Sequence, residues 1–167
     1  MATVTRPSPA EVWDWLSHVP DPEIPVISLT DLGIIRDVAW DDDTLVVTVT
    51  PTYSGCPATA VINLDIEGAL RDRGVGKLRL ARQLAPAWTT DWISAEGREK
   101  LRAAGFAPPA PREAAPPTLL QLQRAPLRCP YCGSTDTKLE NLFGPTPCRS
   151  LRYCSSCRQP FEQFKTI

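Results

Sequence analysis

Two pairs of cysteines constrain the fold of this chain more than any other feature. Cys129-Pro-Tyr-Cys132 and Cys154-Ser-Ser-Cys157 are separated by 21 residues, close to the C-x2-C…C-x2-C spacing of a zinc ribbon. Two residues between cysteines allow a tight turn that aims both thiolates at one ion. Two such turns supply the tetrahedral sulfur shell that Zn(II) prefers. We therefore predict a small β-rich zinc ribbon over residues 127–167, held by these four cysteines.

The predicted ribbon is too small to fold on an apolar core alone. A piece of about 40 residues cannot build a sufficient core, so the ion is expected to be needed for folding. A structural zinc contributes roughly 10–16 kcal/mol of apparent binding free energy at neutral pH, which becomes folding free energy. Paired cysteines favour metal over disulfides in a reducing compartment. A rubredoxin-like iron site, disulfides and an iron–sulfur cluster remain alternatives for the same sulfurs.

A further cysteine of this region, Cys148, is surplus to a four-ligand site. Arg149 and Arg152 lie nearby in the sequence and would favour its thiolate, which would make it a reactive or metal-accepting thiol. A buried apolar thiol is the other interpretation. Cys148 could also replace one ribbon cysteine as a ligand, although its separation from Cys154 is less apt than a two-residue spacing.

The composition of the 167 residues bounds the class of protein. Hydrophobic residues make up 43%, which is enough for a core in the N-terminal part. The net charge of −1 argues against bulk electrostatic binding to nucleic acid or a membrane. No stretch approaches the ~18 apolar residues of a membrane span, and the N-terminus lacks an apolar leader, so we expect a cytoplasmic protein.

Charge is distributed unevenly along the chain. Residues 124–167 contain seven Lys and Arg against three Asp and Glu, so the predicted ribbon is basic and the remainder is acidic. This asymmetry suggests docking to a partner, or attraction between the two domains. Nucleic-acid binding by the ribbon would use five basic residues: Arg128, Lys138, Arg149, Arg152 and Arg158. The acidic first domain disfavours that interpretation.

The first part of the chain alternates helix and strand signals. Ser8 and Glu11 form a capping box around Pro9, which predicts a helix that ends before Pro20. The remaining pattern predicts strands over 34–40, 44–50 and 75–84 and helices over 58–73 and 95–104. The fold class is therefore α+β. We expect a small three-stranded mixed sheet, whose second and third strands are parallel through a right-handed crossover.

A proline-rich stretch divides the chain. Five of the 11 residues from Ala107 to Pro117 are proline, which predicts a semi-rigid linker. We predict an N-terminal domain over residues 1–106, a linker over 107–126 and the ribbon over 127–167. Within the linker, Leu119-Leu-Gln-Leu122 is either a first strand of the ribbon or a docking segment.

The N-terminal domain carries one further candidate thiol. Cys56 follows a glycine and precedes a proline at the start of a predicted helix, where the helix dipole and unpaired N–H groups favour a thiolate. This predicts a soft-metal or iron–sulfur site, near which the loop residues Asp21, Glu23 and Asp31 could lie. One cysteine cannot hold a cluster by itself. Either a second subunit supplies its own Cys56 across a two-fold axis, or other ligands are used. A plain tight turn is the alternative.

Several segments carry a family resemblance. The stretches Asp21-Pro-Glu-Ile-Pro25, Asp31-Leu-Gly-Ile34 and Thr50-Pro-Thr-Tyr-Ser-Gly-Cys-Pro57 resemble the small domain of iron–sulfur assembly factors of the SufT type. Two more stretches narrow the resemblance: Pro86-Ala-Trp-Thr-Thr-Asp-Trp-Ile-Ser-Ala-Glu-Gly-Arg98 and Phe143-Gly-Pro-Thr146. With them, both domains resemble the PaaD family, accessory proteins of the bacterial phenylacetyl-CoA epoxidase system.

This resemblance implies a non-catalytic role in aerobic phenylacetate catabolism. The family is thought to help assemble or maintain the metal centres of the epoxidase, a multicomponent di-iron monooxygenase whose reductase carries flavin and a [2Fe–2S] cluster. Cys56 stands at the family's position for iron–sulfur handling, and Asp21, Glu23 and Asp31 stand at its acidic loop positions. We therefore expect structural Zn(II) in the ribbon, iron or an iron–sulfur cluster held transiently at Cys56, a homodimer, and the reductase or oxygenase as partner. A stoichiometric structural or electron-transfer subunit of the epoxidase is the alternative.

Overall fold

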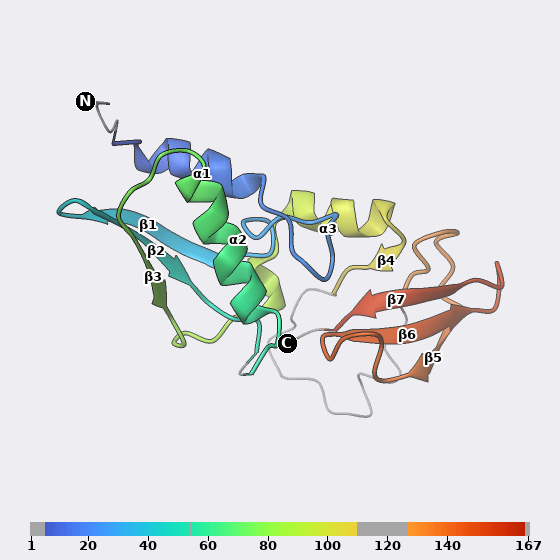
Figure 1. Ribbon diagram of the computed structural model, residues 1–167. Helices are drawn as coiled ribbons and strands as arrows, with labels where there is room; N and C mark the ends of the chain where they lie inside the picture. Colours follow the sequence, from blue (N-terminus) through green and yellow to red (C-terminus); the bar gives the residue numbers. More distant parts are fainter. Residues whose placement is uncertain (1–5, 54, 110–126, 166–167) are drawn as a thin grey trace. The chain divides into compact units, whose positions relative to one another are not determined.

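The computed structural model describes residues 6–53, 55–109 and 127–165, and the chain forms two compact units (Figure 1). The first unit comprises residues 1–94 and the second comprises residues 95–167. Each unit contains its own sheet together with helical segments. The predicted α+β class is confirmed.

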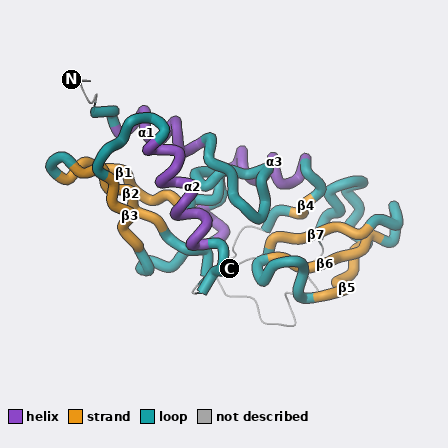
Figure 2. The backbone as a smooth tube through the Cα atoms, viewed as in Figure 1, coloured by secondary structure: helices purple, strands orange, loops and turns teal. Residues whose placement is uncertain are grey.

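The first unit is built on a three-stranded sheet. Its elements are α1 (Pro9–Ser17), β1 (Ile35–Asp41), β2 (Thr44–Val49), α2 (Thr59–Arg71), β3 (Leu78–Arg82) and the short 3-10 helix η1 (Thr90–Trp92). The strand order is β1-β2-β3, with β1 antiparallel and β3 parallel to β2. Helix α2 is the crossover between the two parallel strands, as the tube in Figure 2 shows. The predicted mixed sheet and its parallel pair are confirmed.

The core of this unit follows from the spacing of its apolar residues. Alternate residues of β2 and residues four apart in α2 are buried: Leu45, Val47, Val49, Ile62, Ile66 and Leu70. Helix α1 adds Val12 and Leu16. Each fully buried aliphatic side chain contributes about 1.5–3 kcal/mol relative to exposure. This unit therefore has an apolar core of its own.

Helix α1 begins with the predicted capping box. Ser8 Oγ accepts a hydrogen bond from the Glu11 N–H at 3.3 Å, and the Ser8 N–H donates to Glu11 Oε2 at 2.8 Å. These bonds satisfy N–H groups that the start of a helix leaves open. The hydrogen bond from the Ser8 N–H also holds the pKa of the Glu11 carboxyl below its usual range.

The second unit is built on a four-stranded sheet. Its elements are α3 (Ala95–Ala103), β4 (Phe106–Ala107), β5 (Thr137–Asn141), β6 (Arg149–Cys154) and β7 (Pro160–Phe164). The strand order is β4-β7-β6-β5, in which β4 is parallel to β7 and the other neighbours are antiparallel. The predicted β-rich C-terminal region is present, with one added strand. Across both units, no helix in the described ranges has the length and apolar character needed to cross a membrane.

That added strand is where the structure departs from the sequence prediction. Ala107, expected to begin a linker, is buried and pairs with Gln163 of β7. A two-residue strand that pairs with a distant edge leaves no periodic signal in the sequence, so the prolines that follow it dominated the prediction. The rest of the predicted linker from residue 110 onward, with Leu119-Leu-Gln-Leu122, lies outside the described residues.

Helix α3 and β4 group with the ribbon strands rather than with the first sheet. Gly105 ends α3 with a φ of +84°, and a Cβ at this position would lie 2.7 Å from the Tyr131 hydroxyl. The end of α3 thus packs closely against the turn that contains Tyr131, between Cys129 and Cys132. Only glycine combines this close approach with a positive φ. The domain boundaries at 106 and 127 stay a prediction, while the compact units divide between Ser94 and Ala95.

Candidate metal centre and candidate thiols

The structure brings the four predicted ribbon ligands together. The sulfur atoms of Cys129, Cys132, Cys154 and Cys157 all lie within 4.8 Å of one another. Cys129 Sγ is 3.7 Å from Cys157 Sγ, and Cys132 Sγ is 3.6 Å from Cys154 Sγ. A tetrahedral ion bound at about 2.3 Å places its sulfurs about 3.8 Å apart, so the spacing fits one ion. These residues form a metal-binding site.

The same spacing bears on the other predicted uses of these sulfurs. A disulfide needs about 2.05 Å between its sulfurs, and the cysteines here are free thiols. In an iron–sulfur cluster the cysteines bind different iron atoms, which spreads their sulfurs beyond the shell of a single ion. The geometry therefore accommodates one tetrahedral ion, and both zinc and iron take such a sulfur shell.

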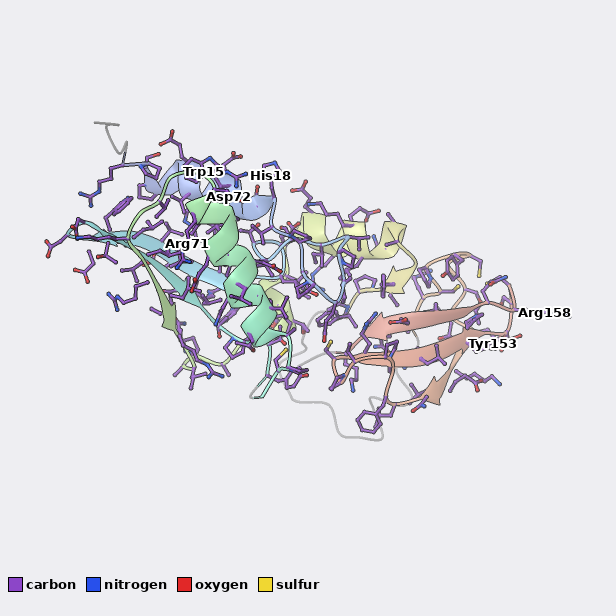
Figure 3. The ribbon with its side chains drawn as sticks, in the orientation of Figure 1. Trp15, His18, Arg71, Asp72, Tyr153 and Arg158 are labelled. Atoms are coloured by element: carbon purple, nitrogen blue, oxygen red, sulfur yellow. The ribbon has the colours of Figure 1, made fainter. Side chains whose placement is uncertain are left out.

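Two equivalent turns shape the ligand set. In the first, the Gly133 N–H donates to the Cys129 carbonyl at 2.9 Å; in the second, the Arg158 N–H donates to the Cys154 carbonyl at 2.9 Å. Gly133 has a φ of +74° and Arg158 a φ of +61°. This left-handed conformation suits glycine and is unfavourable for a residue with a side chain. Figure 3 shows Arg158 at the turn between β6 and β7, where its side chain is exposed.

The sulfur group has a covered side and an open side. Cys129 and Cys154 are buried and belong to a small apolar cluster with Phe161 of β7 and Ala107 of β4. Of the other two ligands, Cys157 is half-buried and Cys132 is exposed. Cys157 also packs against this cluster, so Cys132 is the one ligand of the four that lies toward solvent.

Local hydrogen bonds set the acidities of two of these thiols apart in the metal-free chain. The Cys157 N–H donates to the Cys154 sulfur and lowers the pKa of Cys154 to about 7. Desolvation, with the Cys132 sulfur nearby, raises the pKa of Cys157 to about 12. At neutral pH Cys154 is therefore partly a thiolate. Because a metal binds thiolates, its arrival releases protons from the remaining thiols.

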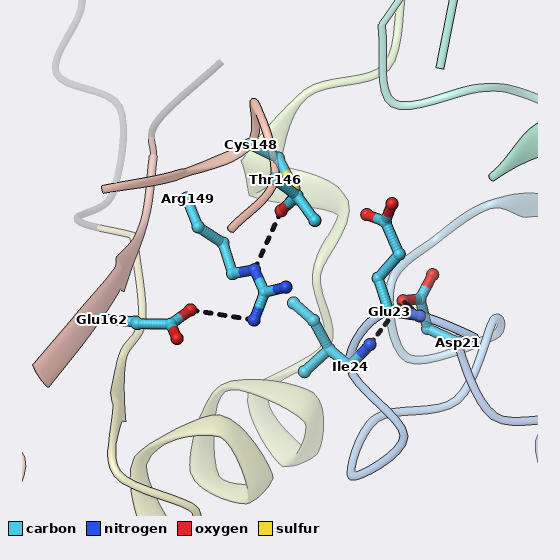
Figure 4. Close-up of polar contacts among 7 residues, drawn as sticks. All are labelled: Asp21, Glu23, Ile24, Thr146, Cys148, Arg149 and Glu162. Atoms are coloured by element: carbon cyan, nitrogen blue, oxygen red, sulfur yellow. Dashed lines mark hydrogen bonds and ion pairs between the residues drawn. The ribbon is translucent and has the colours of Figure 1, made fainter. Parts of the chain in front are cut away.

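Cys148 lies outside the four-sulfur group. Its side chain is buried, and its sulfur is 3.1 Å from the Thr146 hydroxyl. That hydroxyl accepts a hydrogen bond from Arg149 Nε at 2.8 Å, and Arg149 Nη1 pairs with Glu162 at 2.8 Å (Figure 4). Arg149 thus reaches the thiol through the Thr146 hydroxyl. The alternative in which Cys148 replaces a ribbon ligand is not the arrangement found.

Cys56 lies in the loop between β2 and α2 and is half-exposed. Its N–H donates to the Tyr53 carbonyl at 3.3 Å, and its own carbonyl accepts from the Thr59 N–H at 3.2 Å. The helix cap, Ala58, supplies no side-chain hydrogen bond to the start of α2. The cap side chain therefore takes up none of the N–H groups that the start of a helix leaves open.

Asp21 organises the loop that follows α1. Its side chain is buried, and its Oδ1 accepts hydrogen bonds from the N–H groups of Glu23 at 2.9 Å and Ile24 at 2.8 Å (Figure 4). Glu23 itself is half-buried. A carboxylate that accepts two successive N–H groups makes strong, charge-assisted bonds, so Asp21 fixes the turn.

Asp31 joins its own loop to the segment that precedes α3. Its Oδ2 accepts from Ser28 Oγ at 2.9 Å and its Oδ1 from Ser94 Oγ at 2.8 Å. The Asp31 carbonyl also accepts from the Ser94 N–H at 2.8 Å. Beside it, the Trp88 indole N–H donates to the Leu32 carbonyl at 2.8 Å. The buried Asp31 carboxylate is thus a structural junction within the first unit.

The carboxylates of Asp21 and Asp31 have backbone and hydroxyl partners of their own. Within the described residues, Asp21, Glu23 and Asp31 do not join Cys56 in a group of three or more side chains placed to hold a metal ion. Their support of Cys56 stays a prediction. The role of Ser94 was missed, because a serine before a helix is ordinarily assigned to the cap alone.

The comparisons with known proteins cover both units. Residues 113–165 match the family described as the PaaD zinc beta ribbon domain, and residues 9–77 match the family described as iron-sulfur cluster assembly protein. One subunit of the "Putative 1,2-phenylacetyl-CoA epoxidase" of Escherichia coli K12 is 44% identical over 170 residues, which cover 100% of this chain and 98% of that protein. The chain belongs to the PaaD family. The resemblance inferred from the sequence is thereby confirmed over both domains.

Relatives outside the PaaD family match the first unit. An Fe-S protein maturation auxiliary factor of Bacillus subtilis is 36% identical over 81 residues, which cover 47% of this chain and 78% of that factor. The crystal structure of a domain of unknown function, DUF59, from Bacillus anthracis aligns with a TM-score of 0.51 at 26% identity. The alignment covers 56% of this PaaD-family chain and 90% of that domain. The PaaD-family chain thus joins a small α+β domain to a cysteine ribbon.

Proposed function

We propose that this chain is a non-catalytic accessory factor that helps assemble or maintain the iron–sulfur or iron centres of a phenylacetyl-CoA epoxidase. One observation carries the proposal. A single chain joins an iron–sulfur assembly domain to a four-cysteine ribbon, and a relative named as an epoxidase subunit matches it from end to end. The components of the epoxidase, its reductase or its oxygenase, are the proposed partners.

In this proposal the ribbon holds Zn(II) as a structural ion. A catalytic zinc keeps one position of its shell open for water or substrate, whereas four protein sulfurs close the shell. The four cysteines within 4.8 Å of one another supply such a closed shell. A bound ion would keep the two cysteine turns together, and its binding free energy would become folding free energy of the ribbon.

We propose Cys56 as the thiol that binds iron or a cluster transiently, because among the described residues it stands alone on a loop, whereas the ribbon cysteines form a group of four. It is half-exposed on a loop and supplies one sulfur, so any iron or cluster bound there would be held by few protein ligands and could be passed on. A cluster needs more than one cysteine, and two copies of the chain could each contribute Cys56 across a two-fold axis. Asp21 and Asp31 hold the backbone of their own loops, and we propose that these loops, with Glu23, support the site at Cys56.

The test is metal and sulfide analysis of protein purified without oxygen, with a visible spectrum. Cys56→Ser is compared with Cys148→Ser, a matched control that removes a buried thiol outside the ribbon site. We expect a similar zinc content in the unmodified chain and in both variants. We expect an iron- and sulfide-dependent chromophore that is lost in Cys56→Ser and retained in Cys148→Ser. In cells, Cys56→Ser should leave the epoxidase short of its metal centres.

Two results would contradict the proposal. The first is a chain that takes up no iron on reconstitution. The second is epoxidase maturation in cells that is untouched by Cys56→Ser. Zinc without any iron uptake would assign the chain to docking or scaffolding instead.

A second candidate is a stoichiometric structural or electron-transfer subunit of the epoxidase. The full-length relative is named as a subunit, which favours this candidate, and four tetrahedral sulfurs accommodate iron as well as zinc. This candidate predicts that the chain purifies with the oxygenase in a fixed ratio. It also allows redox-active iron in the ribbon that Cys56→Ser does not affect. The accessory role predicts transient association and zinc in the ribbon.

A further inference from the structure

A solvent-exposed hydrogen bond between two serine side chains joins the two cysteine turns. Ser134 Oγ lies 2.8 Å from Ser156 Oγ. Ser134 stands two residues after Cys132, and Ser156 stands immediately before Cys157. The bond therefore joins the two cysteine turns next to Cys132, which is exposed, and Cys157, which is half-buried.

We propose that a metal ion enters and leaves the ribbon past Cys132 and Cys157, and that the Ser134–Ser156 hydrogen bond is a clasp that slows this exchange. The inference rests on the metal-holding ribbon of the proposed function and goes beyond it. It assigns a route and a rate-setting contact to the site, with neither serine acting as a ligand.

The covered side of the site explains why exchange takes place at the open side. Cys129 and Cys154 are 2% and 0% exposed and lie in the apolar cluster with Phe161. Cys154 is also the last residue of β6, where it pairs with Thr137 of β5. Moving either of these two sulfurs away from an ion would expose apolar surface or break the sheet. Moving the Cys132 sulfur requires neither, because that residue is already exposed.

The two turns have equivalent backbone hydrogen bonds, and the serine clasp links one turn to the other. Ser134 Oγ also accepts a hydrogen bond from the Asp136 N–H at 3.1 Å, which fixes the position of this hydroxyl. Ser156 meets it from the other turn. Because the bond ties the turn that carries Cys132 to the other turn, it must break before the Cys132 turn can move outward with its sulfur. Breaking the bond is therefore a step in release that leaves the sulfur shell itself unchanged.

The experiment measures how fast the full chain, loaded with zinc, releases its ion to an excess of a chromogenic chelator. Ser156→Ala removes the clasp, and Ser155→Ala is the matched control, an exposed serine in the same turn whose hydroxyl has no hydrogen bond in the described structure. One neutral hydrogen bond corresponds to about a two- to tenfold change in rate, so Ser156→Ala should release zinc faster by that factor. Ser155→Ala should match the unmodified chain. The visible spectrum of the Co(II)-loaded proteins should be the same in all three.

Two further measurements sharpen the test. Ser134→Ala combined with Ser156→Ala should release zinc no faster than Ser134→Ala alone, because both changes remove one shared bond. Alkylation of the zinc-loaded chain, mapped by mass spectrometry, should modify Cys132 before Cys129 or Cys154. Equal release rates for Ser156→Ala and the unmodified chain would overturn the clasp. First modification at a buried cysteine would overturn the route.

Metal content measured before the chelator is added separates this inference from the proposed function. A chain that binds no ion overturns the metal-holding ribbon and the clasp with it. A fully loaded chain with unchanged release rates overturns the clasp alone.

Discussion

The two compact units are stabilised by different means. The first buries aliphatic side chains from two helices and a sheet, among them Leu16, Leu45 and Ile66 with almost no exposed surface. In the second, the cluster around the metal site consists of Ala107, Cys129, Cys154 and Phe161. Since two of these four residues are candidate metal ligands, we expect the second unit to depend on an ion, whereas the first depends on apolar burial.

The cysteines of the two units differ in the same way. The ribbon gathers four sulfurs into a shell that fits one ion, and two of these cysteines are buried, which would suit retention of the ion. Cys56 is a single half-exposed thiol on a loop, which suits exchange. In the proposed function the ribbon stabilises the fold and Cys56 hands on its cargo, and the two sites differ in offering four sulfurs or one to a metal.

Removal of the metal should have the largest effect and should act on one unit only. The five tryptophans all precede residue 95, so tryptophan fluorescence reports on the first unit alone. We expect a strong chelator, or Cys154→Ser, to unfold the ribbon because about 10–16 kcal/mol of metal-binding free energy is lost. Amide NMR signals of the ribbon should collapse to unfolded positions, while tryptophan fluorescence stays native.

Cys56→Ser serves as the control for that experiment, since it also removes one thiol. It should leave both the ribbon signals and the tryptophan fluorescence unchanged. Tryptophan fluorescence that falls together with the ribbon signals on metal removal would contradict the independence of the two units.

The next largest effect is expected at the junction around Asp31, in the unit that depends on burial. Asp31→Ala takes this acceptor away from the hydroxyls of Ser28 and Ser94 and should lower the free energy of unfolding of the first unit by about 1–3 kcal/mol. Urea unfolding followed by tryptophan fluorescence measures it. Asp37→Ala, at an exposed position of β1, is the control and should change little. Equal effects of the two changes would show that Asp31 is not a junction.

How much could be predicted from the sequence depends, in both units, on whether a feature is local in the chain. The ribbon ligands were predictable because the C-x2-C pairs encode local turns, and the capping box at Ser8 is likewise local. The pairing of Ala107 with β7 and the bond from Ser94 to Asp31 were not, because each joins residues far apart in the chain through contacts that no periodicity records. Local chemistry and the parallel strand pair were therefore predicted, while these two long-range contacts were missed.

A smaller effect is expected at the start of α1. Ser8→Ala should lower the free energy of unfolding of the first unit by about 1 kcal/mol, because the N–H groups of the first turn lose their cap.

The lowered pKa of Glu11 gives this cap a pH dependence. A carboxyl with a depressed folded-state pKa stabilises the fold above its usual pKa, and this contribution disappears as the pH falls through the lowered value. The difference between the unmodified chain and Glu11→Gln in urea unfolding should therefore shrink from pH 7 toward pH 3. A difference that does not vary with pH would contradict this role of Glu11.

The smallest expected effect compares the two cysteine turns with each other. Gly133 and Arg158 occupy the same left-handed position, and only the glycine is at ease there. Arg158→Gly should therefore raise the free energy of unfolding of the zinc-loaded ribbon by less than about 1 kcal/mol, which is measured as a slightly higher melting temperature. The gain is small because the relief of backbone strain is partly offset by the greater freedom of glycine in the unfolded chain. Arg158→Ala keeps the strained backbone and removes the charge, so it should not stabilise. If both changes stabilise equally, the charge of Arg158 rather than its backbone conformation is what costs stability, and the two turns differ for an electrostatic reason.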